Sequence, residues 1–232
     1  GVVPACRSLE CPSIFALTAN DANQIFNALA VYDEKDVYGR PNPFPNTSRF
    51  SGESSIPPRI AIPFKDNLEF FGDEKAEHEF SHAVALWQTL GAEIHRIDIS
   101  PMLEAAKLLY EGAWVTERYV AIEDFMQKNP EAVHSVVGEI ISEGIAKNAV
   151  SFFKNEYAMQ GFRIKADRLL EDIDFLLTPT APRTYTIDQV LNDPKKLNSN
   201  MGYYTNFMNL LDLCGVAVPS GNLDEEQKFG TT

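Results

Sequence analysis

The feature that most constrains the fold is a strand, helix and strand pattern between residues 59 and 98. Arg59-Ile-Ala-Ile-Pro63 is a short apolar segment typical of a buried strand. Apolar residues at 76, 80, 83, 84, 87 and 90 predict a helix over 74–90, which Gly91 is placed to end. Residues 92–98 then alternate like a second strand. Because two strands joined through a helix normally pair in parallel, the sequence predicts an α/β fold.

The rest of the chain is predicted to be mainly helical. Thr18 is placed to cap a helix that continues to about Val31. Proline-rich residues 33–58 are expected to form a long surface connection. Beyond the second strand we expect helices over 100–127, 130–147 and 150–171, a strand over 174–177, a polar loop over 193–202 and a helix over 203–213.

Size and charge limit the possible functions. A chain of 232 residues with 44% hydrophobic content can bury a large core, so residues 1–232 are interpreted as one domain or most of one. The net charge of -13 argues against binding to nucleic acid or to an anionic membrane surface. Three cysteines without disulfide-scaffold spacing are typical of a reducing compartment, and we expect a cytoplasmic protein.

A metal-binding motif is present in the first long helix. His78-Glu79-Phe80-Ser81-His82 has the H-E-x-x-H spacing in which two histidines bind zinc and the glutamate acts as a general base. Helical geometry places both histidines opposite the apolar stripe, which centres on Phe80. The competing interpretation is therefore a solvated helix face, because no third ligand can be assigned.

Tyr110 and Arg118 are candidate anion-binding residues. On a single helix they would stand about 12 Å apart along the axis and roughly 80° apart around it, so that long side chains could converge on one small anion. An arginine offers a planar two-donor fork to a carboxylate, and a tyrosine hydroxyl adds a third hydrogen bond. The alternative is that Tyr110 packs in the core and Arg118 pairs with Glu111, Glu117 or a neighbouring helix.

Several motifs carry a family resemblance. Pro4, Ser8-Leu9-Glu10 and Asp21 resemble the segment that follows the nucleophile loop in amidase signature enzymes. The flanking residues, and the stretch Leu109 to Tyr119, resemble the allophanate hydrolase branch of that family. Further matches along the chain are Thr178-Pro-Thr180, Thr205, Asn209, Gly215, Ala217 and Val218-Pro219.

This resemblance implies a fold, a function and a set of site residues. Residues 1–232 would be a partial amidase signature domain with a mixed central sheet flanked by helices, without the upstream catalytic part and the final strands. Tyr110 and Arg118 match the pair that holds the substrate carboxylate, and Thr178, Pro179 and Thr180 match a segment that borders the active-site cleft. The family's serine nucleophile, second serine and lysine lie upstream of this segment, and its Gly-Gly-Ser-Ser and Gly-Ser-Ile-Arg runs do not occur here. We therefore expect the substrate-recognition portion of an amidohydrolase, inactive alone, that binds allophanate or a related amide.

The resemblance also implies partners. It implies no metal or organic cofactor, a homodimer in the intact enzyme and a functional link to a biotin-dependent urea carboxylase. Two alternatives stay open on the residues alone. One is a non-catalytic fragment or scaffold of the amidase fold, and the other is a zinc peptidase that uses His78 and His82.

Overall fold

The computed structural model describes residues 3–41, 57–225 and 227–232. The chain divides into two compact units, one formed by Gly1–Leu9 with Pro57–Thr232 and the other by Glu10–Ile56. Across the described residues, no helix is long and apolar enough to cross a membrane.

The smaller unit contains helix α1 (Ala19–Leu29). The Thr18 side chain accepts a hydrogen bond from the Asp21 N–H at 3.1 Å, which confirms the predicted cap. None of the helix residues is buried. Most of the expected surface connection, at 42–56, lies outside the described residues.

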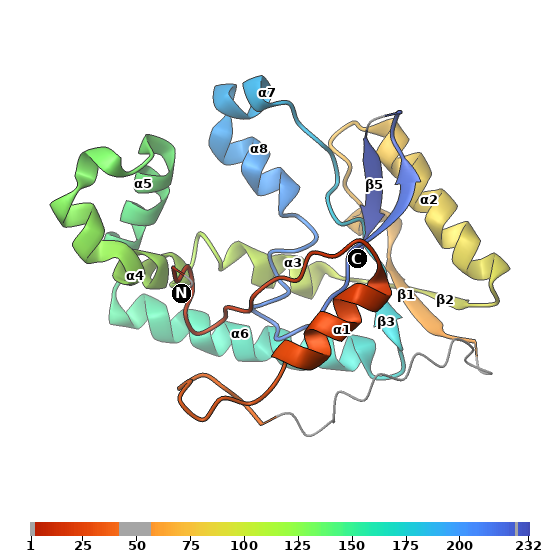
Figure 1. Cartoon of the computed structure of the whole chain (residues 1–232), viewed down its shortest axis with the longest axis horizontal. Helices are drawn as coiled ribbons and strands as arrows, with labels where there is room; N and C mark the ends of the chain where they lie inside the picture. Colours follow the sequence, from red (N-terminus) through yellow and green to blue (C-terminus); the bar gives the residue numbers. More distant parts are fainter. Residues whose placement is uncertain (1–2, 42–56, 226) are drawn as a thin grey trace. The chain divides into compact units, whose positions relative to one another are not determined.

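The larger unit alternates strands and helices (Figure 1). The label η marks 3₁₀ helices. The elements of the larger unit, in chain order, are β1 (Arg59–Pro63), η1 (Lys65–Asn67), α2 (Glu74–Thr89), β2 (Glu93–Ile97), α3 (Ser100–Lys107), α4 (Trp114–Lys128), η2 (Pro130–Ala132), α5 (Ser135–Ser142), η3 (Glu143–Ala146), α6 (Ala149–Leu170), β3 (Phe175–Leu176), α7 (Ile187–Asn192), α8 (Pro194–Met201), β4 (Val218–Asn222) and β5 (Lys228–Thr231).

The strands form a parallel sheet and an antiparallel hairpin. The parallel sheet has the order β2-β1-β3, with Ile60 of β1 opposite Ile94 on one side and Phe175 on the other. Strands β4 and β5 pair in antiparallel fashion. Residues after β3 continue this pairing, because the backbones of Thr178 and Thr232 exchange two hydrogen bonds of 2.9 Å. The parallel β1–β2 pairing and the mixed α/β class are as predicted.

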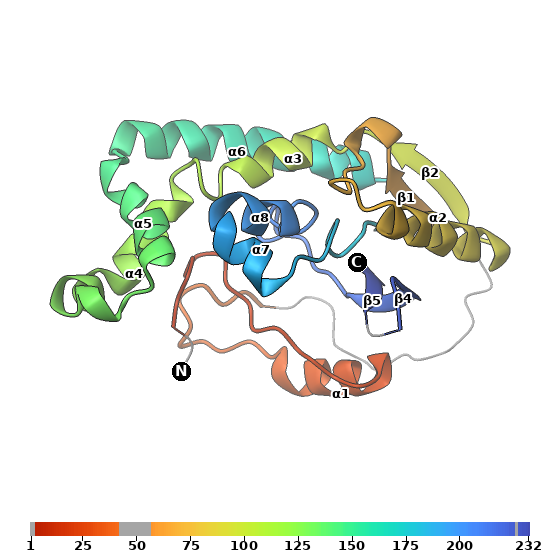
Figure 2. The same cartoon turned by 90° about the horizontal axis from the view of Figure 1, so that it is seen from above.

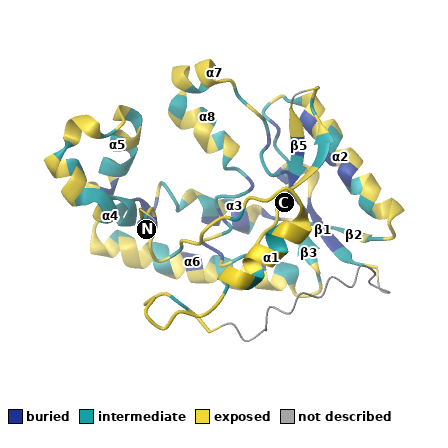
Figure 3. Cartoon of the chain, viewed as in Figure 1, coloured by how far each residue is buried: buried dark blue, intermediate teal, exposed yellow. Residues whose placement is uncertain are grey.

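Two apolar clusters enclose the parallel sheet. Side chains alternate between its faces, as strand geometry requires. Phe175 and Ile94 pack on the cluster that contains Phe80 of α2, whereas the neighbouring Leu176 and Ile97 pack on the cluster that contains Met102 of α3 and Met159 of α6. Strand β1 is buried on both faces (Figure 3), and α3 and α6 run side by side in both views (Figure 2).

Several predicted elements are wrong in extent or type. The helix expected over 100–127 is two helices, α3 and α4, and the stretch 130–147 contains η2, α5 and η3. The loop expected over 193–202 is mostly helix α8, whose sequence is largely polar and which buries no residue, so that hydrophobic periodicity gave little indication of it. Residues 203–213, expected as a helix, form successive turns with hydrogen bonds such as Thr205 N–H to the Gly202 carbonyl at 3.0 Å.

Tertiary contacts explain the turns over 203–213. Tyr204, Phe207, Leu210 and Leu211 are all buried. The Tyr204 hydroxyl also donates to the Glu69 carbonyl at 2.9 Å and accepts from the Glu69 N–H at 2.7 Å. Burial raises the pKa of Tyr204 above its ordinary value, so the hydroxyl remains a donor at neutral pH.

Candidate functional site

The carboxyl ends of β1 and β2 fix the start of α3. Asn67, which follows β1, accepts from the Ile99 N–H at 3.0 Å and donates to the Ser100 Oγ at 3.0 Å. Asp98, which follows β2, accepts from the Ser100 Oγ at 2.6 Å and from its N–H at 2.9 Å. The bonds from Ser100 hold the pKa of Asp98 below its ordinary value, and the bond from the Ser100 side chain contributes most. Helix α3 therefore leaves the sheet at a defined point.

The candidate residue Tyr110 lies in the turn between α3 and α4. The Gly112 N–H donates to the Leu108 carbonyl at 3.1 Å, and a Cβ atom on Gly112 would lie 2.4 Å from that oxygen. Glycine thus permits a backbone approach that another residue would obstruct. The prediction that Tyr110 and Arg118 share one helix is wrong, because the chain turns between them.

The turn nevertheless brings the two predicted side chains together. The Arg118 guanidinium carbon lies 4.9 Å from the centre of the Tyr110 ring, within the range of a cation–π interaction. Both residues are partly buried. A planar guanidinium stacked on a ring has a restricted orientation, so its donors are directed before any ligand binds.

The surroundings of Arg118 leave donor capacity for a ligand. Its Nε atom is buried and has no hydrogen-bond partner among the described residues, and no described carboxylate lies within ion-pair distance. Pairing with Glu111 or Glu117, the alternative considered from the sequence, is therefore not seen. Burial lowers the pKa of Arg118, but contacts with the Cys6 and Tyr110 side chains outweigh it, so the pKa lies above its ordinary value. The group is a fixed cation suited to a small carboxylate.

Sequence reasoning missed the segment that completes this environment. Residues 6–9 form a turn in which the Leu9 N–H donates to the Cys6 carbonyl at 2.8 Å. The buried Cys6 thiol donates to the Trp114 carbonyl at 3.6 Å. Ser8 donates from its N–H and its Oγ to the two carboxylate oxygens of Glu117, each at 2.7 Å. These partners are more than 100 positions apart in the chain, so no local pattern could have indicated them.

The predicted cleft residues Thr178, Pro179 and Thr180 have contacts of their own, separate from those of Tyr110 and Arg118. Thr178 and Pro179 are buried, and Pro179 forms a β-bridge with Thr231. Thr180 is partly exposed and borders a depression of about 330 Å³, which Arg183 and Lys228 also line. Whether these residues form a wall of the substrate cleft stays a prediction.

The H-E-x-x-H motif does not form a metal site in the structure. The His78 side chain is 79% exposed, as the helical geometry predicted. Glu79 is mostly buried and lies against Gly221 of β4. Among the described residues, no group of three or more histidine, cysteine or acidic side chains could hold a metal ion.

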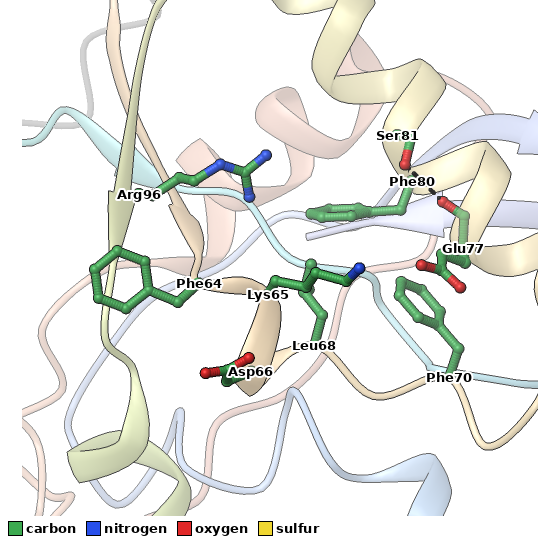
Figure 4. A pocket seen from close by; sticks show the side chains of 9 residues that line it. All are labelled: Phe64, Lys65, Asp66, Leu68, Phe70, Glu77, Phe80, Ser81 and Arg96. Atoms are coloured by element: carbon green, nitrogen blue, oxygen red, sulfur yellow. Dashed lines mark hydrogen bonds between the residues drawn. The ribbon is translucent and has the colours of Figure 1, made fainter.

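A second depression, of about 580 Å³, is lined by residues of the segment 64–70, of α2 and of β2 (Figure 4). Phe70, Phe80 and Leu68 give it an apolar lining. Its charged side chains are Lys65, Arg96, Asp66 and Glu77, so positive and negative charges balance. Such a surface offers no excess positive charge to a small anion.

The parallel sheet flanked by helices and the motifs described above are those of the amidase signature class. The family described as Amidase matches residues 1–230, and the chain belongs to this family. It is 42% identical over 235 residues to the urea amidolyase of Saccharomyces cerevisiae, and the match covers 100% of this chain and 12% of that protein.

Solved structures agree with this assignment. The allophanate hydrolase of Kluyveromyces lactis superimposes with a TM-score of 0.91 at 39% identity, covering 100% of this chain and 37% of that one. The Kluyveromyces lactis urea amidolyase gives a TM-score of 0.90 at 39% identity, covering 100% of this chain and 14% of that one. The chain thus spans only a minor part of each of these relatives.

Proposed function

We propose that this chain is the substrate-recognition portion of an allophanate hydrolase, which releases ammonia and carbon dioxide from allophanate in urea degradation. The observation that carries the proposal is the Arg118 guanidinium, stacked on Tyr110 with its buried Nε–H unpaired within the described residues. The similarity to an allophanate hydrolase and to urea amidolyases supports it.

The substrate's chemistry fits this arrangement. Allophanate carries a carboxylate beside the amide that is cleaved. The fork of Arg118 would bind that carboxylate, and the Tyr110 hydroxyl would add a hydrogen bond. Holding the anionic end fixes the position of the amide at the other end of the molecule, which is how orientation contributes to catalysis.

The hydrolytic step belongs to residues that the resemblance places before Gly1. The nucleophilic serine would attack the amide carbonyl and form an acyl-enzyme, while the lysine and the second serine relay its proton to the nitrogen that leaves as ammonia. Water would then cleave the acyl-enzyme. In this proposal the present chain supplies Tyr110 and Arg118, with Thr178 to Thr180 at the cleft wall, and is inactive alone.

The partners in the proposal follow from the relatives. The match fills 37% of the allophanate hydrolase chain but 14% of the urea amidolyase chain, so the second chain is more than twice as long. Its additional length is consistent with a second activity, which the resemblance implies to be a biotin-dependent urea carboxylase. A cytoplasmic homodimer is the expected form of the intact enzyme.

Replacing Arg118 in the intact enzyme tests the proposal. We expect Arg118→Ala to lower kcat/KM for allophanate by a factor that corresponds to about 2 to 5 kcal/mol of transition-state stabilisation, because a desolvated carboxylate loses its charged partner. Arg96→Ala removes the same charge from the depression of about 580 Å³, which Arg118 does not line, and serves as the control. An Arg118→Ala enzyme with wild-type kcat/KM would contradict the assignment.

The same assay separates the alternatives. Ammonia release from allophanate would be measured for the 232-residue chain and for the intact enzyme, with and without EDTA. Activity in the intact enzyme that survives EDTA agrees with the proposal. Inactivity of the intact enzyme would indicate a non-catalytic scaffold, and activity lost to EDTA would direct attention to His78 and His82.

A further inference from the structure

The contact between Ser8 and Glu117 lies beside the proposed carboxylate site. Glu117 precedes Arg118 in the first turn of α4. Both of its carboxylate oxygens accept from Ser8 at 2.7 Å, one from the N–H and one from the Oγ. Two charge-assisted bonds to one residue define a geometry more closely than a single bond does.

This contact holds a turn rather than a single side chain. The Leu9 N–H closes the turn on the Cys6 carbonyl at 2.8 Å, and the Leu9 carbonyl accepts from the Asn209 Nδ2 at 2.7 Å. Within the turn, Cys6 is 5% exposed and donates its thiol to the Trp114 carbonyl. The turn is therefore fastened to α4 at both Cys6 and Ser8.

Cys6, in the turn of residues 6–9, also interacts with Arg118. The Cys6 side chain and Tyr110 are the neighbours that raise the pKa of Arg118 against the effect of its burial. The Cys6 thiol also binds the carbonyl of Trp114, which lies one helical turn before Arg118 in α4, and the Tyr110 ring lies 4.9 Å from the guanidinium carbon. Cys6 and Tyr110 are thus placed to restrain the same guanidinium. Glu117 itself is adjacent in sequence to Arg118 and does not pair with it, since its oxygens are directed to Ser8.

We propose that Glu117 is a positioning residue, which fastens the turn of residues 6–9 to α4 and through Cys6 keeps the Arg118 guanidinium over Tyr110. The expected effect of Glu117 on substrate binding rests on the proposed function. The structural part of the inference concerns only how Arg118 is held. Loosening the turn lets the guanidinium adopt other orientations, and a ligand must then bear the cost of ordering it.

The first measurement reads Arg118 directly. In the ¹⁵N-labelled chain, solvent exchange of the Arg118 Nε–H is followed by NMR. We expect Glu117→Gln to accelerate this exchange about tenfold, because local opening becomes easier. Ser8→Ala should act in the same direction, and Ser8→Thr, which keeps the hydroxyl donor, should restore slow exchange. Asp124→Asn neutralises an 87%-exposed carboxylate on the same helix and is the control.

The second measurement reads binding of malonamate, in which a methylene replaces the central N–H of allophanate. We expect Glu117→Gln to raise the calorimetric Kd about tenfold, as loss of a charge-assisted bond would. Asp124→Asn should leave the Kd unchanged. In an Arg118→Ala background, Glu117→Gln should have no further effect, because its influence passes through Arg118.

The outcomes separate this inference from the proposed function. Unchanged Nε–H exchange in both Glu117→Gln and Ser8→Ala overturns the inference whatever the ligand does, and Ser8→Ala decides alone if Glu117→Gln does not fold. Wild-type malonamate affinity in Arg118→Ala overturns the proposed function, while the exchange data still decide the role of Glu117. Weaker binding in Arg118→Ala with unaltered binding and exchange in Glu117→Gln contradicts only the positioning role.

Discussion

Three side chains of different kinds determine the properties of the candidate site at the residue scale. The centre of the Tyr110 ring lies 4.9 Å from the Arg118 guanidinium carbon, and Cys6, from the first residues of the sequence, is a buried neighbour. Arg118 itself keeps an unpaired Nε–H within the described residues. A cation that is held in this way loses little conformational entropy when a carboxylate binds.

Substitutions at Tyr110 separate the hydroxyl from the ring. Tyr110→Phe should weaken malonamate binding by about 0.5 to 1.5 kcal/mol, the usual value of one hydrogen bond. Tyr110→Leu should weaken it by about 0.5 to 2 kcal/mol more, because the cation–π contact is also lost. Titration calorimetry of both variants measures the two steps. Equal affinities for Tyr110→Phe and the wild type would mean that the hydroxyl does not contact the ligand.

The sequence allowed the proximity of the pair to be predicted but not the route that produces it, and its binding of an anion stays a prediction. A long cationic and a phenolic side chain near one another suggested an anion site, and the structure brings Tyr110 and Arg118 into contact. The route is a turn rather than a common helix. Cys6 and Ser8 were missed as neighbours of the site, and Glu117 was considered as a partner of Arg118 but binds Ser8 instead. Contacts over more than 100 positions leave no local periodicity from which to predict them.

At the scale of elements, the break between α3 and α4 decides where Tyr110 lies. Gly112→Ala should reduce the free energy of unfolding by about 1 to 3 kcal/mol, because the new Cβ would overlap the Leu108 carbonyl. Gly161→Ala is the matched control within α6, where a Cβ meets no atom within 4 Å. That variant should gain about 0.5 to 1 kcal/mol from helix propensity. Urea denaturation of both proteins checks the opposite signs, and a stabilised Gly112→Ala would contradict the account of the turn.

The start of α3 should depend on pH through Asp98. Its folded-state pKa is lowered, first by the Ser100 side chain, so its stabilising effect is present above the unfolded-state value of about 3.9. This contribution is lost as pH falls through the lower folded-state pKa. The acid-induced decrease in unfolding free energy should be smaller in Asp98→Asn, by less than ~1 kcal/mol because the carboxylate is exposed. Superimposable pH profiles for Asp98→Asn and the wild type would show that this cap contributes nothing.

Elements were predicted well where an apolar stripe or a cap was present. Helix α2 agrees to within one residue of the predicted 74–90, because its stripe and Gly91 define its length. Helix α8 is largely polar, and the turns over 203–213 are held by buried side chains and by the Tyr204 hydroxyl. Neither feature can be derived from local sequence, since distant residues such as Glu69 provide the partners.

At the scale of the whole molecule, the larger unit builds its site on a sheet enclosed by two apolar clusters. The strand, helix and strand pattern predicted this α/β class correctly, because parallel pairing follows from the connection. The partner strand for Thr178 could not be predicted in the same way. It comes from β5 at the end of the chain, through pairing that no spacing rule specifies.

The central claim is that this chain recognises a carboxylate through Arg118. The most direct test is calorimetric titration of the 232-residue chain with malonamate and with malonamide, which replaces the carboxylate by a neutral amide. The account predicts that the wild type binds malonamate more tightly than malonamide, and that Arg118→Ala loses this preference by about 2 to 5 kcal/mol while Arg96→Ala keeps it. Equal affinity of the wild type for both compounds, or an undiminished preference in Arg118→Ala, would contradict it.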